Sequence, residues 1–219
     1  SLGLVGSEMC IRDRDEYNNK DTARFFSKIF RVYCGGTFFV ASFLILTCKI
    51  ITKVLVADAY FDSWQYVPVL IISTVFSCLV NFLASIYMAE KKNIMAMVTA
   101  LTGAVTNVVL NLILIPRMGA NGAAVATACA FVVVFLTRSR DTRRFIKINY
   151  QPVVLTCQTV VLVAQTVAAL CLQGVWFYVA EALLFALMLG MNWYQVVELY
   201  KLVTTKMLAK LKKPKTEEE

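Results

Sequence analysis

The sequence contains no histidine and few charged residues, since aspartate, glutamate, lysine and arginine together make up 16% of its 219 residues. Histidine is the commonest general base and a common zinc ligand, so two frequent kinds of catalytic site are disfavoured. The seven cysteines form no CxxC pair, a spacing typical of zinc and redox sites. The sequence also shows no nucleophile–base pair and no glycine-rich phosphate loop. We therefore expect no metal, no cofactor and no enzymatic activity.

Hydrophobic residues are abundant where charged residues are few. They make up 59% of the chain, compared with roughly 45–50% in soluble domains. Apolar stretches of about 20 residues recur along the chain, and about 20 helical residues cross a hydrocarbon core of roughly 30 Å. The sequence predicts an all-α polytopic membrane protein. Its six transmembrane helices are expected at residues 32–57, 66–89, 94–115, 120–137, 152–172 and 175–197.

The basic residues alternate in position along the chain. They gather before the first segment, after the second, after the fourth (from Arg138 to Lys147) and after the sixth. The intervening loops contain Arg117 as their one basic residue, and the first of them contains Asp58 and Asp62. The positive-inside rule then predicts that both ends are cytoplasmic. The net charge of +8 is accordingly expected to serve contact with anionic membrane lipids and not with nucleic acid.

Both ends are expected to lie outside the helical lobe. Residues 1–14, SLGLVGSEMCIRDR, resemble translated sequencing-adapter DNA. We therefore expect a native chain cut near Asp15, which makes the protein a fragment of a longer one. Residues 15–31 mix basic and apolar positions, which predicts either a cytoplasmic amphipathic helix at the membrane surface or an extension of the first membrane helix. Residues 198–219 are expected to form a basic cytoplasmic tail.

A tight helical hairpin is predicted at residues 107–127, NVVLNLILIPRMGANGAAVAT. Pro116 is expected to stop the first helix and Gly119 to permit the reversal. Small residues then recur every four positions, which lets two helix backbones approach closely in lipid. The preceding helix carries a matching row of small or polar residues that is expected to face inward: Thr99, Gly103, Asn107 and Asn111.

The hairpin pattern N-x-x-x-N-L-x-L-I-P-x-x-G-x-x-G-A-A-x-A-T, together with SIYMAEKKN at 85–93 and DAYFDSWQYVPVL at 58–70, resembles the C-terminal half of bacterial polysaccharide flippases. These belong to the superfamily that includes lipid II flippases and the multidrug (MATE) exporters. The resemblance implies one lobe of a two-lobe, MOP-type transporter in the bacterial inner membrane. Its substrate would be an undecaprenyl-diphosphate-linked oligosaccharide, and the N-terminal lobe of the same chain would be its missing partner.

Polar residues inside membrane segments are the candidate site residues. Lys49 and Lys53 would form a cationic cavity wall for a diphosphate, or would extend toward lipid headgroups. Ser77 and Asn81 belong to a polar stripe from Ser73 to Ser85, which would line a water-filled path or bond neighbouring helices. Asn107 and Asn111 would line the cavity or, as we favour, form helix-to-helix contacts. Glu181 would be an ion-coupling group or an acid that reaches water.

Two other functions remain open. A MATE-type antiporter of organic cations would need acidic residues in its cavity, whereas the buried charges here are mainly lysines. A non-transporting membrane scaffold would need the polar stripes to be fully satisfied by each other. The sequence favours an anionic, lipid-linked substrate that is moved by alternating access.

Overall fold

Six α-helices make up the described part of the computed structural model, which covers residues 2–55, 63–144, 149–172 and 174–211; at 2–21, 194, 196 and 198–211 only the backbone is described. The helices are α1 (Leu2–Leu55), α2 (Val67–Ala89), α3 (Asn93–Met118), α4 (Ala120–Thr142), α5 (Pro152–Cys171) and α6 (Val175–Leu211). Each contains a stretch long and apolar enough to cross a membrane. The predicted all-α polytopic fold is confirmed.

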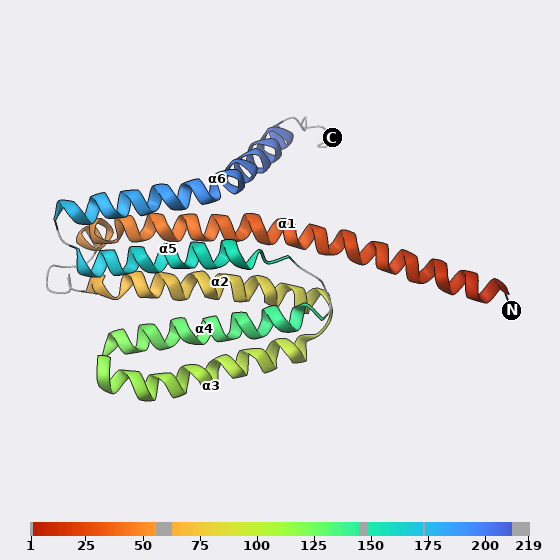
Figure 1. Cartoon of the computed structure of the whole chain (residues 1–219), viewed down its shortest axis with the longest axis horizontal. Coiled ribbons are helices and arrows are strands. Elements are labelled where there is room, and N and C mark those ends of the chain that lie inside the picture. Colours follow the sequence, from red (N-terminus) through yellow and green to blue (C-terminus); the bar gives the residue numbers. More distant parts are fainter. Residues whose placement is uncertain (1, 56–62, 145–148, 173, 212–219) are drawn as a thin grey trace, which may run out of the picture.

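The helices form two groups that lie side by side (Figure 1). α1, α5 and α6 contact one another, α4 packs between α2 and α3, and α2 joins the groups through contacts with α1 and α5. The first part of α1 and the last part of α6 project beyond the bundle at the same end. We call this the basic end, because the turn with Lys91 and Lys92 and the arginines that close α4 lie there. The other is the opposite end.

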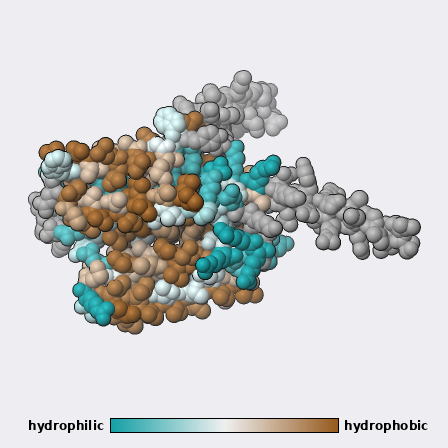
Figure 2. Space-filling model, viewed as in Figure 1, coloured by the Kyte–Doolittle hydropathy of each residue, from teal (hydrophilic) through white to brown (hydrophobic). Residues whose placement is uncertain are grey.

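The visible surface of the bundle is largely apolar (Figure 2). Large hydrophobic side chains such as Leu112, Val160 and Leu183 are more than 60% exposed, while Phe38, Leu79 and Leu162 are fully buried. In Figure 2 hydrophobic residues cover most of the visible face, and hydrophilic residues gather toward the basic end and at the α3–α4 turn. A protein that is apolar on both sides of its helices has lipid as its natural solvent.

The first helix begins earlier than residue 32, where the sequence predicts its start. α1 continues without interruption through residues 20–31, and Phe30 lies in the core with 2% of its surface exposed. Residues 22–31 therefore continue α1 without a break, and their place at the cytoplasmic membrane surface stays a prediction. Apolar contacts explain the result, because Phe30 packs against Phe82 of α2 and Tyr150. That residues 1–14 are foreign to the protein stays a prediction.

The α3–α4 hairpin is present, but Pro116 does not end α3. The helix runs on to Met118 and is closed by Gly119, whose N–H bonds the carbonyl of Ile115 at 2.8 Å. Proline costs a helix the hydrogen bond that its own nitrogen would donate, and near the last turn this loss is small. Gly119 adopts φ +57° and ψ −135°, a conformation that glycine alone adopts easily.

α4 also extends further than its sequence predicts. It ends at Thr142, so Arg138 belongs to the helix and not to the following loop. α6 similarly runs to Leu211 as one helix. Several residues of the sequence analysis lie outside the described parts of the chain: the loop with Asp58 and Asp62, Lys147, and the end of the basic tail at 212–219.

Candidate functional site

A long groove separates α1 from α2. Its volume is about 1030 Å³, and its walls are mostly apolar. α1 contributes the longer wall, from Phe25 and Lys28 to Leu44, and α2 contributes Ile71, Thr74, Val75 and Cys78. Within the α1 wall, Tyr33 stacks on Phe82 of α2 with ring centroids 5.4 Å apart.

The polar stripe of α2 continues one face of this groove. Asn81 and Ser85 lie three and seven residues after Cys78, so they share its side of the helix. Both are exposed. Ser77 is half-buried, and neither Ser77 nor Asn81 makes a side-chain hydrogen bond within the described parts of the chain. Ser73 differs from them, because it is buried and its hydroxyl reaches the carbonyl of Ala124 in α4 at 3.5 Å.

Lys49 lies at the opposite end, away from the groove. Its Nζ lies 3.7 Å from the ring centroid of Phe177 and 4.4 Å from that of Trp64, and it donates to the carbonyl of Leu172 at 3.4 Å. Two aromatic faces and a carbonyl stabilise a partly buried ammonium group well. Lys53, one turn further, is exposed. The structure therefore does not place the two lysines on one cavity wall.

Glu181 is fully buried between α1, α5 and α6. The Nε2 atom of Gln165 donates to its Oε2 at 3.1 Å, and Ser42 donates to Gln165 Oε1 at 2.7 Å. The Oε1 atom of Glu181 has no hydrogen-bond partner in the described parts of the chain. The expectation that this acid reaches water is wrong for this conformation, since its exposure is 0%. A buried carboxylate with a free oxygen suits the binding of a proton or a small cation.

A second polar cluster lies closer to the basic end of the same interface. The thiol of Cys34 lies 3.8 Å from Gln158 Oε1, and Gln158 donates to Asn192 Oδ1 at 2.6 Å. One layer of apolar side chains separates this cluster from Glu181 and Gln165. Its members, Phe38, Leu162 and Met188, have an exposure of 0%. Gln158 and Gln165, seven residues apart on α5, thus belong to two separate hydrogen-bonded clusters.

Asn107 joins α3 to α4, and Asn111 bonds Asn107 from the next turn of α3. Asn107 donates to Thr127 Oγ1 at 3.3 Å, and Asn111 donates to Asn107 Oδ1 at 2.8 Å. Next to them on the same face, Gly103 lies directly beneath Val134. The inward orientation of this row is confirmed. The bond of Asn107 to Thr127 corresponds to the helix-to-helix role, whereas Asn111 bonds within α3 and its Oδ1 has no partner among the described residues.

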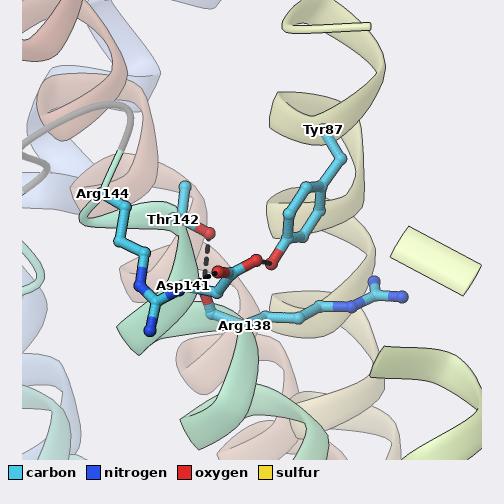
Figure 3. A network of polar contacts seen from close by, with 5 residues as sticks. All are labelled: Tyr87, Arg138, Asp141, Thr142 and Arg144. Carbon is cyan, nitrogen blue, oxygen red and sulfur yellow. Dashed lines mark hydrogen bonds and ion pairs between the residues drawn. The ribbon is translucent and has the colours of Figure 1, made fainter. Parts of the chain in front are cut away.

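Arg138 crosses between three helices near the basic end (Figure 3). Nε donates to Thr99 Oγ1 at 3.0 Å, Nη1 to the carbonyl of Val80 at 2.9 Å and Nη2 to the carbonyl of Ala96 at 3.1 Å. Figure 3 shows its side chain running past Tyr87 and away from Asp141, which instead accepts a hydrogen bond from Tyr87 at 2.8 Å. The guanidinium therefore joins α2, α3 and α4 through neutral acceptors.

Arg138→Lys is expected to destabilise this part of the bundle, because lysine keeps the buried charge but cannot reproduce the planar fork of arginine. Losing one or two hydrogen bonds from a charged donor costs about 1.5–3 kcal/mol each. Thermal unfolding in detergent measures the effect. Arg140→Lys is the matched control, since Arg140 is exposed two residues away. An equal loss of thermal stability in both variants would contradict the role of Arg138 in joining the three helices.

Several of these residues escaped the sequence analysis. Ser42 and Asn192 look like isolated polar residues in apolar segments, and Arg138 looks like a loop residue. A usable signal was the spacing of Gln158 and Gln165, seven residues apart, because it marks one face of α5 as polar over two turns. Their partners on α1 and α6 follow only from the packing. In comparisons with protein-family models, curated proteins and solved structures, nothing matches the chain.

Proposed function

We propose that the chain forms one lobe of a bacterial inner-membrane transporter that moves an undecaprenyl-diphosphate-linked oligosaccharide by alternating access. The groove between α1 and α2 carries the proposal. A second lobe would be its partner, so this lobe alone should bind lipid but not transport it.

The dimensions of the groove suit a long isoprenoid chain. The wall from Phe25 to Leu44 covers about 28 Å at 1.5 Å per residue, close to the roughly 30 Å of a hydrocarbon core. Its volume of about 1030 Å³ is at the upper end of the roughly 300–1,000 Å³ typical of small-molecule pockets. Apolar walls over this depth favour a lipid that lies along the groove.

The charge at the basic end suits a diphosphate. Lys28 lines the groove there, and the exposed Arg24 lies about one turn before it on α1. Phosphate groups bind lysine and arginine through charge-assisted hydrogen bonds. A substrate that enters from this side would bring its diphosphate to these side chains while its isoprenoid chain follows the apolar walls.

The polar face of α2 supports a second lobe or a water-filled path in front of it. Asn81 is exposed and unbonded within the described residues, and an amide that faces lipid alone is costly. A scaffold protein would satisfy this stripe inside its own bundle, which the positions of Ser77 and Asn81 do not favour. Glu181 is the group that we propose for ion coupling, since it is the buried acid of the α1–α5–α6 interface.

Native mass spectrometry of the purified full chain would test the proposal. The chain is exposed to undecaprenyl diphosphate, undecaprenol and phosphatidylglycerol at equal concentration. Undecaprenyl diphosphate should be retained in preference to both, because it alone offers the isoprenoid chain and the diphosphate together. Equal retention of phosphatidylglycerol, or preferential binding of an organic cation, would contradict it.

A further inference from the structure

A small cavity lies beside the polar cluster of Cys34, Gln158 and Asn192. Its volume is about 10 Å³, and its walls come from α1, α5, α6 and the residues that precede α5. Two of its lining residues hold buried polar atoms without a hydrogen-bond partner among the described residues: Arg31, through Nε, and Gln195, through Oε1. An unpaired donor and an unpaired acceptor on the walls of one cavity indicate a ligand that both accepts and donates.

Water is the ligand that fits. A cavity of about 10–15 Å³ accessible to a water-sized probe holds one water molecule, which typically makes about three hydrogen bonds. The hydroxyl of Tyr150, which lines the same cavity, also lacks a partner among the described residues. Burial raises the pKa of this phenol to about 12, so it remains a neutral hydroxyl at pH 7. An anion would suit the site less well, because Gln195 Oε1 would repel it.

The backbone of α1 leaves room for this arrangement. A methyl group on Gly35 would overlap Gln195 Oε1 and would lie 2.8 Å from the Cδ atom of the same side chain. The carboxamide of Gln195 therefore occupies the position that any other residue at 35 would fill. Its exposure is 9%, so the unpaired oxygen is held away from bulk solvent.

We propose that this cavity is a hydration site, with one water molecule bound between Arg31 and Gln195, and that it opens the Cys34–Gln158–Asn192 cluster to solvent at the basic end. The role of this water in a proton path, given next, rests on the proposed transport function. The water would form the cytoplasmic mouth of a proton path toward Glu181, closed in this conformation by the apolar layer of Phe38, Leu162 and Met188.

The charged and titratable groups around this path are few. Among the described side chains, α1 contributes Arg31, Cys34, Cys48 and Lys49, and α6 contributes Glu181. The segment before α5 contributes Tyr150, on which Arg143 packs with its Cζ 5.5 Å from the ring centroid. α5 faces the path with uncharged residues. Glu181 is thus the one acid in the described part of the interface. A proton that passes the apolar layer would meet the glutamine and serine that hold this carboxylate.

Hydroxyl-radical footprinting by X-ray radiolysis tests the site, because radicals form from bound water and oxidise the side chains next to it. Two native cysteines on α1 serve as reporters. Cys34 lines the cavity with 6% exposure, and Cys48 has 2% exposure and lies outside it. Cys34 should oxidise at least threefold faster than Cys48 in the purified full chain. Equal, slow oxidation of both would overturn the hydration site.

Two variants connect the labelling to Gln195. Gln195→Leu removes the acceptor, and Gly35→Ala displaces the carboxamide; each should lower the oxidation of Cys34 at least threefold. Gln65→Leu, at the opposite end, is the control and should leave it unchanged. Oxidation of Cys34 that neither variant changes would refute the proposed water position, whatever lipid the chain binds.

The apolar layer has its own test. Leu162→Ala should let water pass and raise the oxidation of Cys48 severalfold, whereas Val163→Ala, at a 44% exposed position of the same helix, should not. Cys48 that stays unlabelled in a folded Leu162→Ala variant would refute the path to Glu181. This measurement needs no transported substrate, so its failure is separate from a failure of the lipid-binding test.

Discussion

Gly122→Ala is expected to destabilise the protein by about 3 kcal/mol, the upper part of the range for overpacked interiors. A methyl group at this position would overlap the carbonyl oxygen of Leu114 and would lie 2.6 Å from its carbon and 3.0 Å from the nitrogen of Ile115. All three are backbone atoms of α3, so no side chain can move aside. The hairpin itself would have to open, and thermal unfolding in detergent should show the loss.

Gly190→Ala is the matched control for this prediction. Gly190 also lies within a helix, but a methyl group there would meet nothing within 4 Å. Alanine in an open helical position should stabilise the protein by about 0.5–1 kcal/mol. The two variants therefore make the same chemical change with opposite expected signs. Equal thermal midpoints would show that the hairpin does not depend on this close backbone approach.

The hairpin shows why much of the fold is predictable from sequence. Each membrane helix must satisfy its backbone hydrogen bonds internally and must be long enough to span the lipid, so long apolar runs mark the helices clearly. Small residues mark where two helices touch. Gly122, Ala126 and Ala130 are all buried, and their spacing of four residues is by itself enough to predict that they share one helix face.

The boundaries were less predictable, because they depend on partners elsewhere in the chain. Arg138 looks like a loop residue by charge alone, yet acceptors on α2 and α3 hold it inside the bundle. Phe30 looks like part of a surface helix, yet Phe82 and Tyr150 cover it. Charge and periodicity describe a segment by itself, whereas burial of a polar or aromatic group depends on what packs against it.

The candidate site shows the same division. The sequence identifies four polar residues as unusual, because polar side chains inside a membrane are costly. They are Lys49, Glu181, Asn107 and Asn111. Their surroundings did not follow from the sequence: aromatic rings hold Lys49, and Gln165 and Ser42 enclose Glu181 through hydrogen bonds. The groove between α1 and α2 was not predicted, since its walls consist of ordinary apolar residues with no distinctive pattern.

Val40→Trp is expected to lower the retention of undecaprenyl diphosphate by the chain at least tenfold. Val40 lines the groove one turn before Leu44, the last residue of the α1 wall, and is 53% exposed, so an indole ring can fill the groove without disturbing the core. Tryptophan is among the largest side chains, and a lipid that lies along the groove would have to pass it. Native mass spectrometry with the same three lipids measures the change.

Val160→Trp separates a blocked groove from a general effect of tryptophan in lipid. Val160 is 61% exposed on α5 and does not line the groove, so this variant should retain undecaprenyl diphosphate as the parent does. Thr74→Trp fills the groove from the wall that α2 contributes, and it should reproduce the loss seen with Val40→Trp. If both groove variants bind as well as Val160→Trp, the lipid lies elsewhere on the lobe, and the groove loses its place as the site that supports transport. If Val40→Trp and Thr74→Trp both lose retention of undecaprenyl diphosphate, the bound lipid contacts α1 and α2 at once, as a chain lying between the two helices must.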